Sequence, residues 1–394
     1  MQYRIDQKSG NELSALGFGC MRLPRGVSGR IDIDKTEKLV MSAIENGVNY
    51  FDTAYVYFGS EAAVGEVLHR NNAREDIFLA TKLPFRQCKT YDDFDRLFNM
   101  QLAHLKTDYI DYYLIHNISE TSLWDGLAAL GIERWIADKK ACGKIRQIGF
   151  SFHGSQKDFL ALLDAYAWDF CQIQYNYVNE NYQAGRAGLD KAHSMGIPVV
   201  VMEPLLGGKL ATGLPEKAEK AFSDANAEIT PAAWALRWLW DQPGVTVVLS
   251  GMNSAAQLED NIVSARGAAT GMLSDSERAV YKDVVKIFSE SYKIPCTGCD
   301  YCMPCPSRVN IPGCFAAYNT SYVTGYISGI TMYLTGAGAT DPDKNYRSRN
   351  CVKCGRCEKL CPQHIKIRDS LDAVTKRLDP FWLNAVLKLV AKFR

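Results

Sequence analysis

Apolar residues recur along the chain in short runs, and most runs are followed by a longer stretch with helical periodicity. The helical stretches include 34–46, 60–70, 122–141 and 254–265. Eight runs have the length and composition of buried strands: Leu16–Cys20, Val48–Phe51, Ile77–Lys82, Ile110–His116, Ile145–Ser151, Phe170–Tyr175, Ile197–Met202 and Val245–Leu249. Eight strand–helix alternations predict an α/β fold, the closed parallel (β/α)8 or TIM barrel.

A doubly wound open sheet is the competing architecture for the same alternation. Such a sheet favours a glycine-rich fingerprint loop after its first strand. The segment from Gly17 to Arg22 does not complete that fingerprint, so the pattern favours the barrel.

The barrel pattern does not extend over the whole chain. We expect the barrel over 1–285, a linker over 286–295 and a cysteine-rich domain over 296–379. The last segment, 380–394, has the apolar face and terminal cations of a short amphipathic helix.

Charge and composition exclude several classes of protein. The 394 residues include 45 basic and 44 acidic ones, so no overall charge favours nucleic acid or an anionic membrane. The N-terminus lacks an apolar secretory run, and Thr, Ser and Gly interrupt the most apolar stretch, 321–340. Nine of the 13 cysteines fall within 296–361, which indicates metal binding in a reducing compartment rather than a secreted disulfide scaffold. These features predict a cytoplasmic protein without a transmembrane segment.

Polar residues close or follow several predicted strands. Asp52, Lys82 and His116 do so on the second, third and fourth strands, and Tyr57 lies five residues after Asp52. In a (β/α)8 barrel these ends form the catalytic rim. A lysine cation lowers the pKa of a nearby tyrosine, an aspartate holds the lysine, and a histidine can donate to a carbonyl oxygen. The four residues together indicate carbonyl reduction.

Two longer motifs contain these residues. One runs from Phe51-Asp52-Thr53-Ala54-Tyr55-Val56-Tyr57 to Gly65-Glu66, and the other runs from Leu102 to His116, with Ala80-Thr81-Lys82 between them. In order and spacing they resemble the two signatures of the aldo-keto reductases over roughly 1–265. The resemblance implies that Tyr57 is the general acid/base, that Lys82 and Asp52 tune it, and that His116 orients the carbonyl.

The same resemblance implies a nicotinamide cofactor, NADP or NAD. Gly251 and Gln257 stand where the family often carries cations for a 2′-phosphate, so the sequence leaves the preference between the two open. The nicotinamide contacts it implies are Ser151, Gln172 and Met202, and those at the adenosine end are Ser250, Gly251, Gln257 and Asn261.

Two cysteine quartets indicate metal binding in addition to the predicted catalytic rim. They are Cys296, Cys299, Cys302 and Cys305, followed by Pro306, and Cys351, Cys354, Cys357 and Cys361, followed by Pro362. Three cysteines at successive two-residue spacing suit a [4Fe–4S] cluster, whereas paired Cys-x2-Cys knuckles would suit zinc, the main alternative.

The quartets resemble those of bacterial two-cluster ferredoxins, in which each run lends its fourth cysteine to the other cluster. The resemblance implies a ferredoxin-like domain with two [4Fe–4S] clusters. One would take Cys296, Cys299, Cys302 and Cys361, and the other Cys305, Cys351, Cys354 and Cys357. Because Cys305 follows Cys302 after two residues rather than three, Cys314 is a substitute candidate.

The sequence thus predicts an oxidoreductase that interconverts a carbonyl and an alcohol and exchanges electrons with a flavoprotein or ferredoxin-type partner. A partner flavin, or one bound here, would bridge the two-electron chemistry of nicotinamide and the one-electron chemistry of the clusters. The alternatives are a redox-sensing or interaction protein with a slow or vestigial site, and clusters with a purely structural role.

Overall fold

The computed structural model describes residues 1–336, 345–381 and 383. Their contacts separate the chain into two compact units. The first contains Met1–Leu205 and Ala232–Ser274, and the second contains Leu206–Pro231 and the chain from Asp275 onward.

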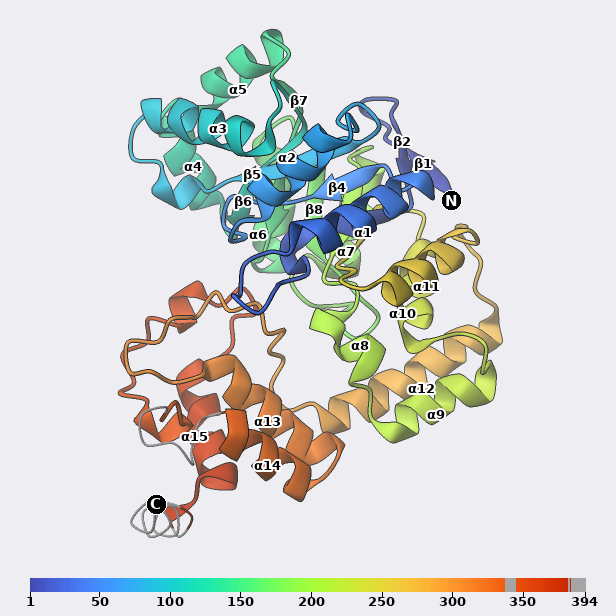
Figure 1. Ribbon diagram of the computed structural model, residues 1–394, viewed down its shortest axis with the longest axis vertical. Helices are drawn as coiled ribbons and strands as arrows, with labels where there is room; N and C mark the ends of the chain where they lie inside the picture. The colour runs from blue at the N-terminus through green and yellow to red at the C-terminus, as the bar shows by residue number, and fades with distance from the viewer. Residues whose placement is uncertain (337–344, 382, 384–394) are drawn as a thin grey trace. The chain divides into compact units, whose positions relative to one another are not determined.

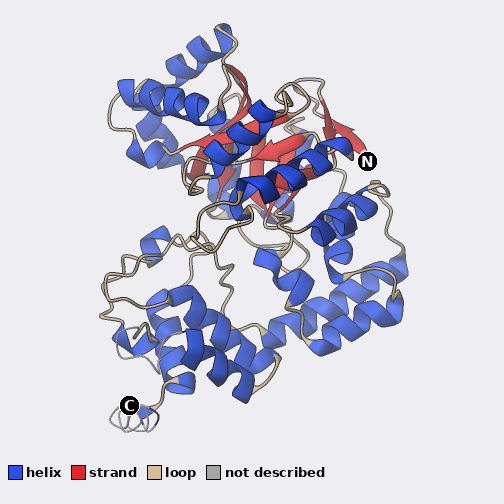
Figure 2. Cartoon of the chain, in the orientation of Figure 1, coloured by secondary structure: helices blue, strands red, loops and turns tan. Residues whose placement is uncertain are grey.

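A closed barrel of eight parallel strands forms the centre of the first unit (Figures 1 and 2). Each strand pairs with the next along the chain, and the last pairs with the first, so the barrel rather than the open sheet is confirmed. The strands are β3 (Leu16–Gly19), β4 (Tyr50–Asp52), β5 (Phe78–Leu83), β6 (Ile110–Ile118), β7 (Ile145–Phe152), β8 (Phe170–Gln174), β9 (Val199–Met202) and β10 (Val245–Ser250).

The barrel interior is filled by alternate residues of the strands. Tyr50, Tyr112, Phe170 and Val200 belong to one buried cluster. Gly17 leaves room for this cluster, because a Cβ at position 17 would lie only 2.7 Å from Cγ1 of Val247. Side chains two residues apart on a strand share a face. The inward face therefore continues, at the carboxyl ends of the strands, to Asp52, Lys82, His116, Ser151, Gln172, Gln174 and Met202.

Amphipathic helices surround the barrel. In α1, the Asp32 carboxylate caps the first turn by accepting the Lys35 N–H at 3.1 Å. Gly65 lets α2 approach the end of α3, because a Cβ there would lie 2.3 Å from the His104 carbonyl oxygen. The helices are α1 (Ile33–Glu45), α2 (Ser60–Arg70), α3 (Asp92–Leu105), α4 (Thr121–Ala129), α5 (Ile132–Ala141), α6 (Gln156–Ala165), α7 (Gly185–Ser194), α10 (Pro231–Trp240) and α11 (Ala255–Ala265).

A short antiparallel hairpin, β1 (Tyr3–Ile5) and β2 (Glu12–Ser14), precedes the barrel strands. Leu13 packs into the interior cluster, and the Asp6 carboxylate accepts the Tyr112 hydroxyl at 2.7 Å. The hairpin therefore covers the amino-terminal end of the barrel.

The second unit begins with α8 (Lys209–Thr212), α9 (Glu216–Ala225) and the long helix α12 (Asp275–Ser291). Phe222 of α9 packs against Tyr281 of α12 with ring centroids 5.8 Å apart. The segment 286–295, predicted as a linker, is helical as far as Ser291. Phe288 continues the buried face of α12, which explains why the helix extends past the expected end of the barrel region.

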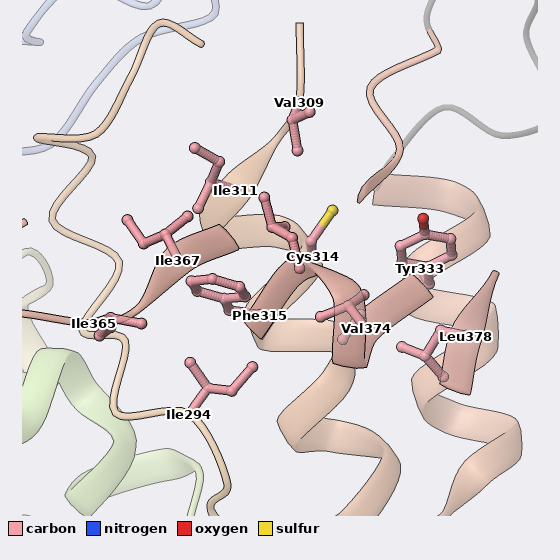
Figure 3. Packing of buried hydrophobic residues seen from close by; sticks show 12 residues of the cluster. Ile294, Val309, Ile311, Cys314, Phe315, Tyr333, Ile365, Ile367, Val374 and Leu378 are labelled. Atoms are coloured by element: carbon pink, nitrogen blue, oxygen red, sulfur yellow. The ribbon is translucent and has the colours of Figure 1, made fainter. Parts of the chain in front are cut away.

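Within the described residues, the cysteine-rich part of this unit contains three further α-helices, α13 (Ile311–Val323), α14 (Tyr326–Gly336) and α15 (Ile367–Leu378). Figure 3 shows their shared core, in which Phe315, Tyr333, Ile367 and Leu378 are all buried. Among these helices, buried Asp379 accepts the Tyr333 hydroxyl at 3.1 Å and pairs with Arg349 and Arg347.

Most of the helix predicted over 380–394 lies outside the described residues. Within the described part of the chain, no helix is both long and apolar enough to span a membrane.

Candidate active site and cysteine-lined cavities

A buried ion pair lies at the carboxyl end of the barrel. Nζ of Lys82, on β5, donates to both carboxylate oxygens of Asp52, on β4, at 2.6 and 2.7 Å. It also donates to the Thr53 carbonyl at 2.8 Å, so all three ammonium hydrogens have acceptors. Lys82 is 1% exposed and Asp52 is 4% exposed. The pair therefore holds a positive charge in a fixed position at the barrel mouth.

Tyr57 and His116 lie beside this pair. The Lys82 ammonium is 5.0 Å from the centre of the Tyr57 ring, and the Tyr57 and His116 rings meet edge to face with centroids 6.1 Å apart. The structure thus brings together all four residues that the sequence selected as catalytic.

Burial sets the protonation state of His116. Desolvation, followed by the positive charge of Lys82, holds its pKa well below the usual value. His116 is therefore neutral near pH 7 and keeps one ring N–H to donate. Burial also lowers the pKa of Lys82, and the Asp52 carboxylate opposes that effect.

A second layer of polar groups supports Lys82 and was not selected from the sequence. The buried carboxylate of Glu61, on α2, accepts the Thr81 hydroxyl at 2.7 Å and the Gln101 amide at 2.6 Å. The Gln101 amide also donates to the Lys82 carbonyl at 3.0 Å and accepts the Tyr113 hydroxyl at 2.7 Å. This network fixes the β5 backbone that carries Lys82.

The predicted nicotinamide contacts lie on neighbouring strands. Ser151 and Gln172 are register partners on β7 and β8. Ser151 Oγ accepts the Asn117 N–H at 2.8 Å, and Gln172 Nε2 donates to Asp52 at 3.0 Å. Gln172 Oε1 is buried and has no partner within the described residues. A carboxamide N–H of a nicotinamide is a donor that would satisfy it, so these residues fit the cofactor that the sequence implies.

The next position on β8 carries another glutamine that sequence reasoning did not select. Gln174 is fully buried, faces inward like Gln172 and is the register partner of Met202 on β9. Both of its amide heteroatoms lack partners in the described part of the chain. Unpartnered buried amides are rare in proteins, and at the barrel mouth they indicate a polar ligand or ordered water.

The predicted adenosine-end residues divide into a buried pair and an exposed pair. Asn261 Nδ2 donates to Ser250 Oγ at 2.7 Å, and both side chains are buried. Gly251 and Gln257 are exposed, and Gln257 Oε1 accepts the Asn253 N–H at the start of α11.

The structure brings Arg22 close to this loop, a proximity that the sequence had not indicated. Cβ of Arg22 lies 4.0 Å from the position that a Cβ on Gly251 would occupy. Because Arg22 is more than 200 residues away in sequence, only the closure of β10 on β3 reveals this proximity.

The eight cysteines of the two quartets line two cavities in the second unit. One, of about 20 Å³, is lined by Cys296, Cys299, Cys302 and Cys361 together with apolar residues such as Ile311 and Phe315. The other, of about 190 Å³, is lined by Cys305, Cys351, Cys354 and Cys357, and Cys302 also reaches it. The smaller cavity thus has three cysteines of the first run and the fourth of the second, and the larger has three of the second run with both Cys302 and Cys305 of the first.

Nowhere in the described residues do three cysteine, histidine or carboxylate side chains gather closely enough to hold a single metal ion. The cysteines line the walls of the two cavities instead, and a cubane, whose four irons each bind one thiolate, suits such spread ligands. The donor set thus fits two [4Fe–4S] clusters.

Cys314 belongs to neither cavity. It is fully buried in the core between α13, α14 and α15, and its Sγ lies 3.9 Å from the Tyr346 carbonyl oxygen (Figure 3). The candidate substitute ligand is thus a core side chain, and Cys305 lines the cavity in its place.

Comparison with known families agrees with both sites. Residues 15–270 match the profile of the Aldo/keto reductase family, and residues 295–366 match that of a 4Fe-4S dicluster domain.

The chain is also similar to individual reductases. The chain is 31% identical, over 279 residues, to the 6-dehydroglucose reductase of Novosphingobium aromaticivorans, covering 64% of this chain and 86% of the relative. The aldo-keto reductase AKR11C1 of Bacillus halodurans, in its holo form, superposes with a TM-score of 0.59 at 26% identity, over 72% of this chain and 96% of that structure. An aldo-keto reductase of Klebsiella pneumoniae solved with NADPH shares the fold at 23% identity and a TM-score of 0.59, with 72% and 95% covered.

Proposed function

The chain belongs to the aldo/keto reductase family, and from this membership we propose that its barrel interconverts a carbonyl and an alcohol by means of Tyr57, Lys82, Asp52 and His116. The observation that carries the proposal is the packing of Tyr57 against both the Lys82 ammonium and the His116 ring at the barrel mouth.

Each residue has a separate role in the proposal. A bound nicotinamide supplies or accepts the hydride. Tyr57 gives its phenolic proton to the carbonyl oxygen, and the Lys82 ammonium stabilises the negative charge that develops on the phenol. Neutral His116 donates a hydrogen bond to the same carbonyl oxygen. Asp52 and the Thr53 carbonyl hold the Lys82 ammonium in place.

Ser151, Gln172 and Met202 would hold the nicotinamide ring, and the Ser250–Asn261 pair together with the amino-terminal end of α11 would hold the adenosine phosphates. Backbone N–H groups at a helix start favour phosphate. The Cβ of Arg22 lies near Gly251, and we propose that its guanidinium provides the cation that Gly251 and Gln257 lack, which favours NADP over NAD.

We further propose that the two cysteine-lined cavities hold one [4Fe–4S] cluster each. Clusters accept one electron and nicotinamide transfers two, so exchange between them requires a flavin, which a partner flavoprotein can provide. No disulfide joins any two of the 13 cysteines, all of which lie within the described residues, and this supports a reducing compartment, the cytoplasm.

The test is steady-state oxidation of NADPH by anaerobically purified protein with a panel of aldehydes, ketones and oxidised sugars. The name of the Novosphingobium relative makes oxidised glucose derivatives the first substrates to try. Turnover that depends on the carbonyl compound would support the proposal. Absence of turnover throughout the panel, with intact clusters and bound nucleotide, would favour a sensing or interaction role.

A further inference from the structure

The two cysteine-lined cavities differ in how closely they approach the surface. The cavity of Cys305, Cys351, Cys354 and Cys357 is also lined by Val352 and Leu360, whose side chains are 70% and 51% exposed. Cys354 is itself exposed, whereas each cysteine of the other quartet is at least partly covered. A group bound in this cavity would be separated from solvent by single side chains.

Exposed apolar residues are common on protein surfaces and need no explanation when they are scattered. Val352 and Leu360 differ because both also line the cavity of a proposed redox group. The side chain of Arg356 joins them, since it lines the same cavity and is exposed. An apolar contact next to a redox centre, with cations around it, has the composition of a docking surface.

The charge of this surface is positive. The segment 351–361 carries Lys353, Arg356 and Lys359 against one acidic residue, Glu358, which pairs with Arg368 at 2.8 Å. Lys353 pairs with Asp372 at 2.8 Å. Arg356 and Lys359 are exposed and form no ion pair with any residue that the structure describes.

We propose that the exposed side chains of Val352, Arg356, Lys359 and Leu360, here called the 352–360 surface, dock an acidic one-electron carrier protein. The inference rests on the proposed function, because it requires a cluster in the cavity below. The apolar pair provides the contact, and Arg356 and Lys359 attract the carrier's carboxylates during the encounter. One electron passes from the reduced carrier to the oxidised cluster, so the carrier is oxidised by one electron and no bond forms or breaks.

The experiment uses the full-length, cluster-loaded protein and a reduced, acidic flavodoxin as the probe. Stopped-flow absorbance follows cluster reduction, and calorimetry measures binding of the oxidised flavodoxin. The test variant is Arg356→Glu with Lys359→Glu. The matched control is Lys282→Glu with Lys286→Glu on α12, which changes the net charge by the same amount at two other exposed lysines.

We expect the test variant to bind flavodoxin at least about 10-fold more weakly and to lose most of the salt dependence of the parent's rate, with the control near the parent. The proposal is overturned if flavodoxin binding weakens equally in the test and control variants, or if it weakens in neither. Anionic phosphatidylserine vesicles form a second arm. If the test variant loses only vesicle binding, the surface recognises lipid and the carrier proposal is wrong.

Reduction by dithionite distinguishes failure of the docking proposal from failure of the proposed function. One outcome is that dithionite reduces the clusters at the same rate in parent and variant while flavodoxin binds to neither protein. That result contradicts the docking surface alone. Protein without reducible clusters contradicts the proposed function as well.

Discussion

Gln172 donates a hydrogen bond from Nε2 to Oδ2 of Asp52 at 3.0 Å. Asp52 is thus shared between the Lys82 ammonium and a residue on the opposite strand β8, whose other amide atom is buried and unpartnered among the described residues. The proposed nicotinamide contact and the proposed catalytic ion pair are therefore one hydrogen-bonded unit. A change in Gln172 should affect both.

Gln172→Leu should weaken NADPH binding by about 2- to 10-fold, the size of one neutral hydrogen bond. It should lower kcat as well, because Asp52 loses a donor that fixes it against Lys82. Fluorescence titration with NADPH and steady-state kinetics measure the two effects. A change in binding with kcat unaltered would show that the Gln172–Asp52 contact does not support catalysis.

The pH dependence of carbonyl reduction should reveal the state of His116. Because burial depresses its pKa, His116 stays neutral as the pH falls from 7.5 through 6.5, the usual histidine value. We therefore expect kcat/KM to be flat across that interval. A tenfold fall in kcat/KM per pH unit below 6.5 that disappears in His116→Gln would contradict this assignment.

Removal of one partner of the Asp52–Lys82 pair should lower the stability of the protein. Asp52→Ala leaves the buried Lys82 ammonium without its counter-ion and should lower the free energy of unfolding by about 3–5 kcal/mol. The double variant Asp52→Ala with Lys82→Met should recover part of this loss, because it removes the uncompensated charge. Urea denaturation measures both, and a loss below about 1 kcal/mol in the single variant would show that the pair is not buried as described.

Arg22 should discriminate between the two nicotinamide cofactors. Arg22→Ala should raise KM for NADPH and leave KM for NADH nearly unchanged, because only the former carries the 2′-phosphate. Arg30→Ala, an exposed arginine in the following loop, is the control. Equal effects on both cofactors would place Arg22 elsewhere, for example on the shared pyrophosphate.

The cysteine assignment can be checked by metal analysis. The protein should contain about eight irons and eight sulfides per chain. Cys357→Ala should lose about half of each, whereas Cys314→Ala should lose none, because Cys314 lies in the apolar core. Stoichiometric zinc without sulfide would contradict the assignment of iron–sulfur clusters. Loss of iron in Cys314→Ala would indicate that Cys314 is a ligand after all.

The sequence predicted the barrel well because buried parallel strands are near-continuous apolar runs. Each of the eight predicted strands overlaps an observed one, and the tetrad lies at the carboxyl ends of the strands or just beyond them. The hairpin β1–β2 was not predicted, since its strands have three residues each and carry no long apolar pattern.

The remaining site residues depend on contacts between distant segments. Arg22 and Gly251 become neighbours only when the barrel closes, and the Glu61–Gln101 network joins two helices behind β5. The role of Cys314 depends in the same way on the packing of α13 against α14 and α15. Spacing within a motif cannot reveal such contacts, because they follow from tertiary packing.

The most direct test of the central claim is the single-turnover rate of carbonyl reduction by Tyr57→Phe, compared with Tyr55→Phe as a neighbouring control. Removal of the Tyr57 hydroxyl takes away the proposed proton donor and should lower that rate by about 100- to 10,000-fold, with NADPH binding retained. Tyr55→Phe should remain near the parent. A Tyr57→Phe variant that reduces carbonyls at the parent rate would contradict the account.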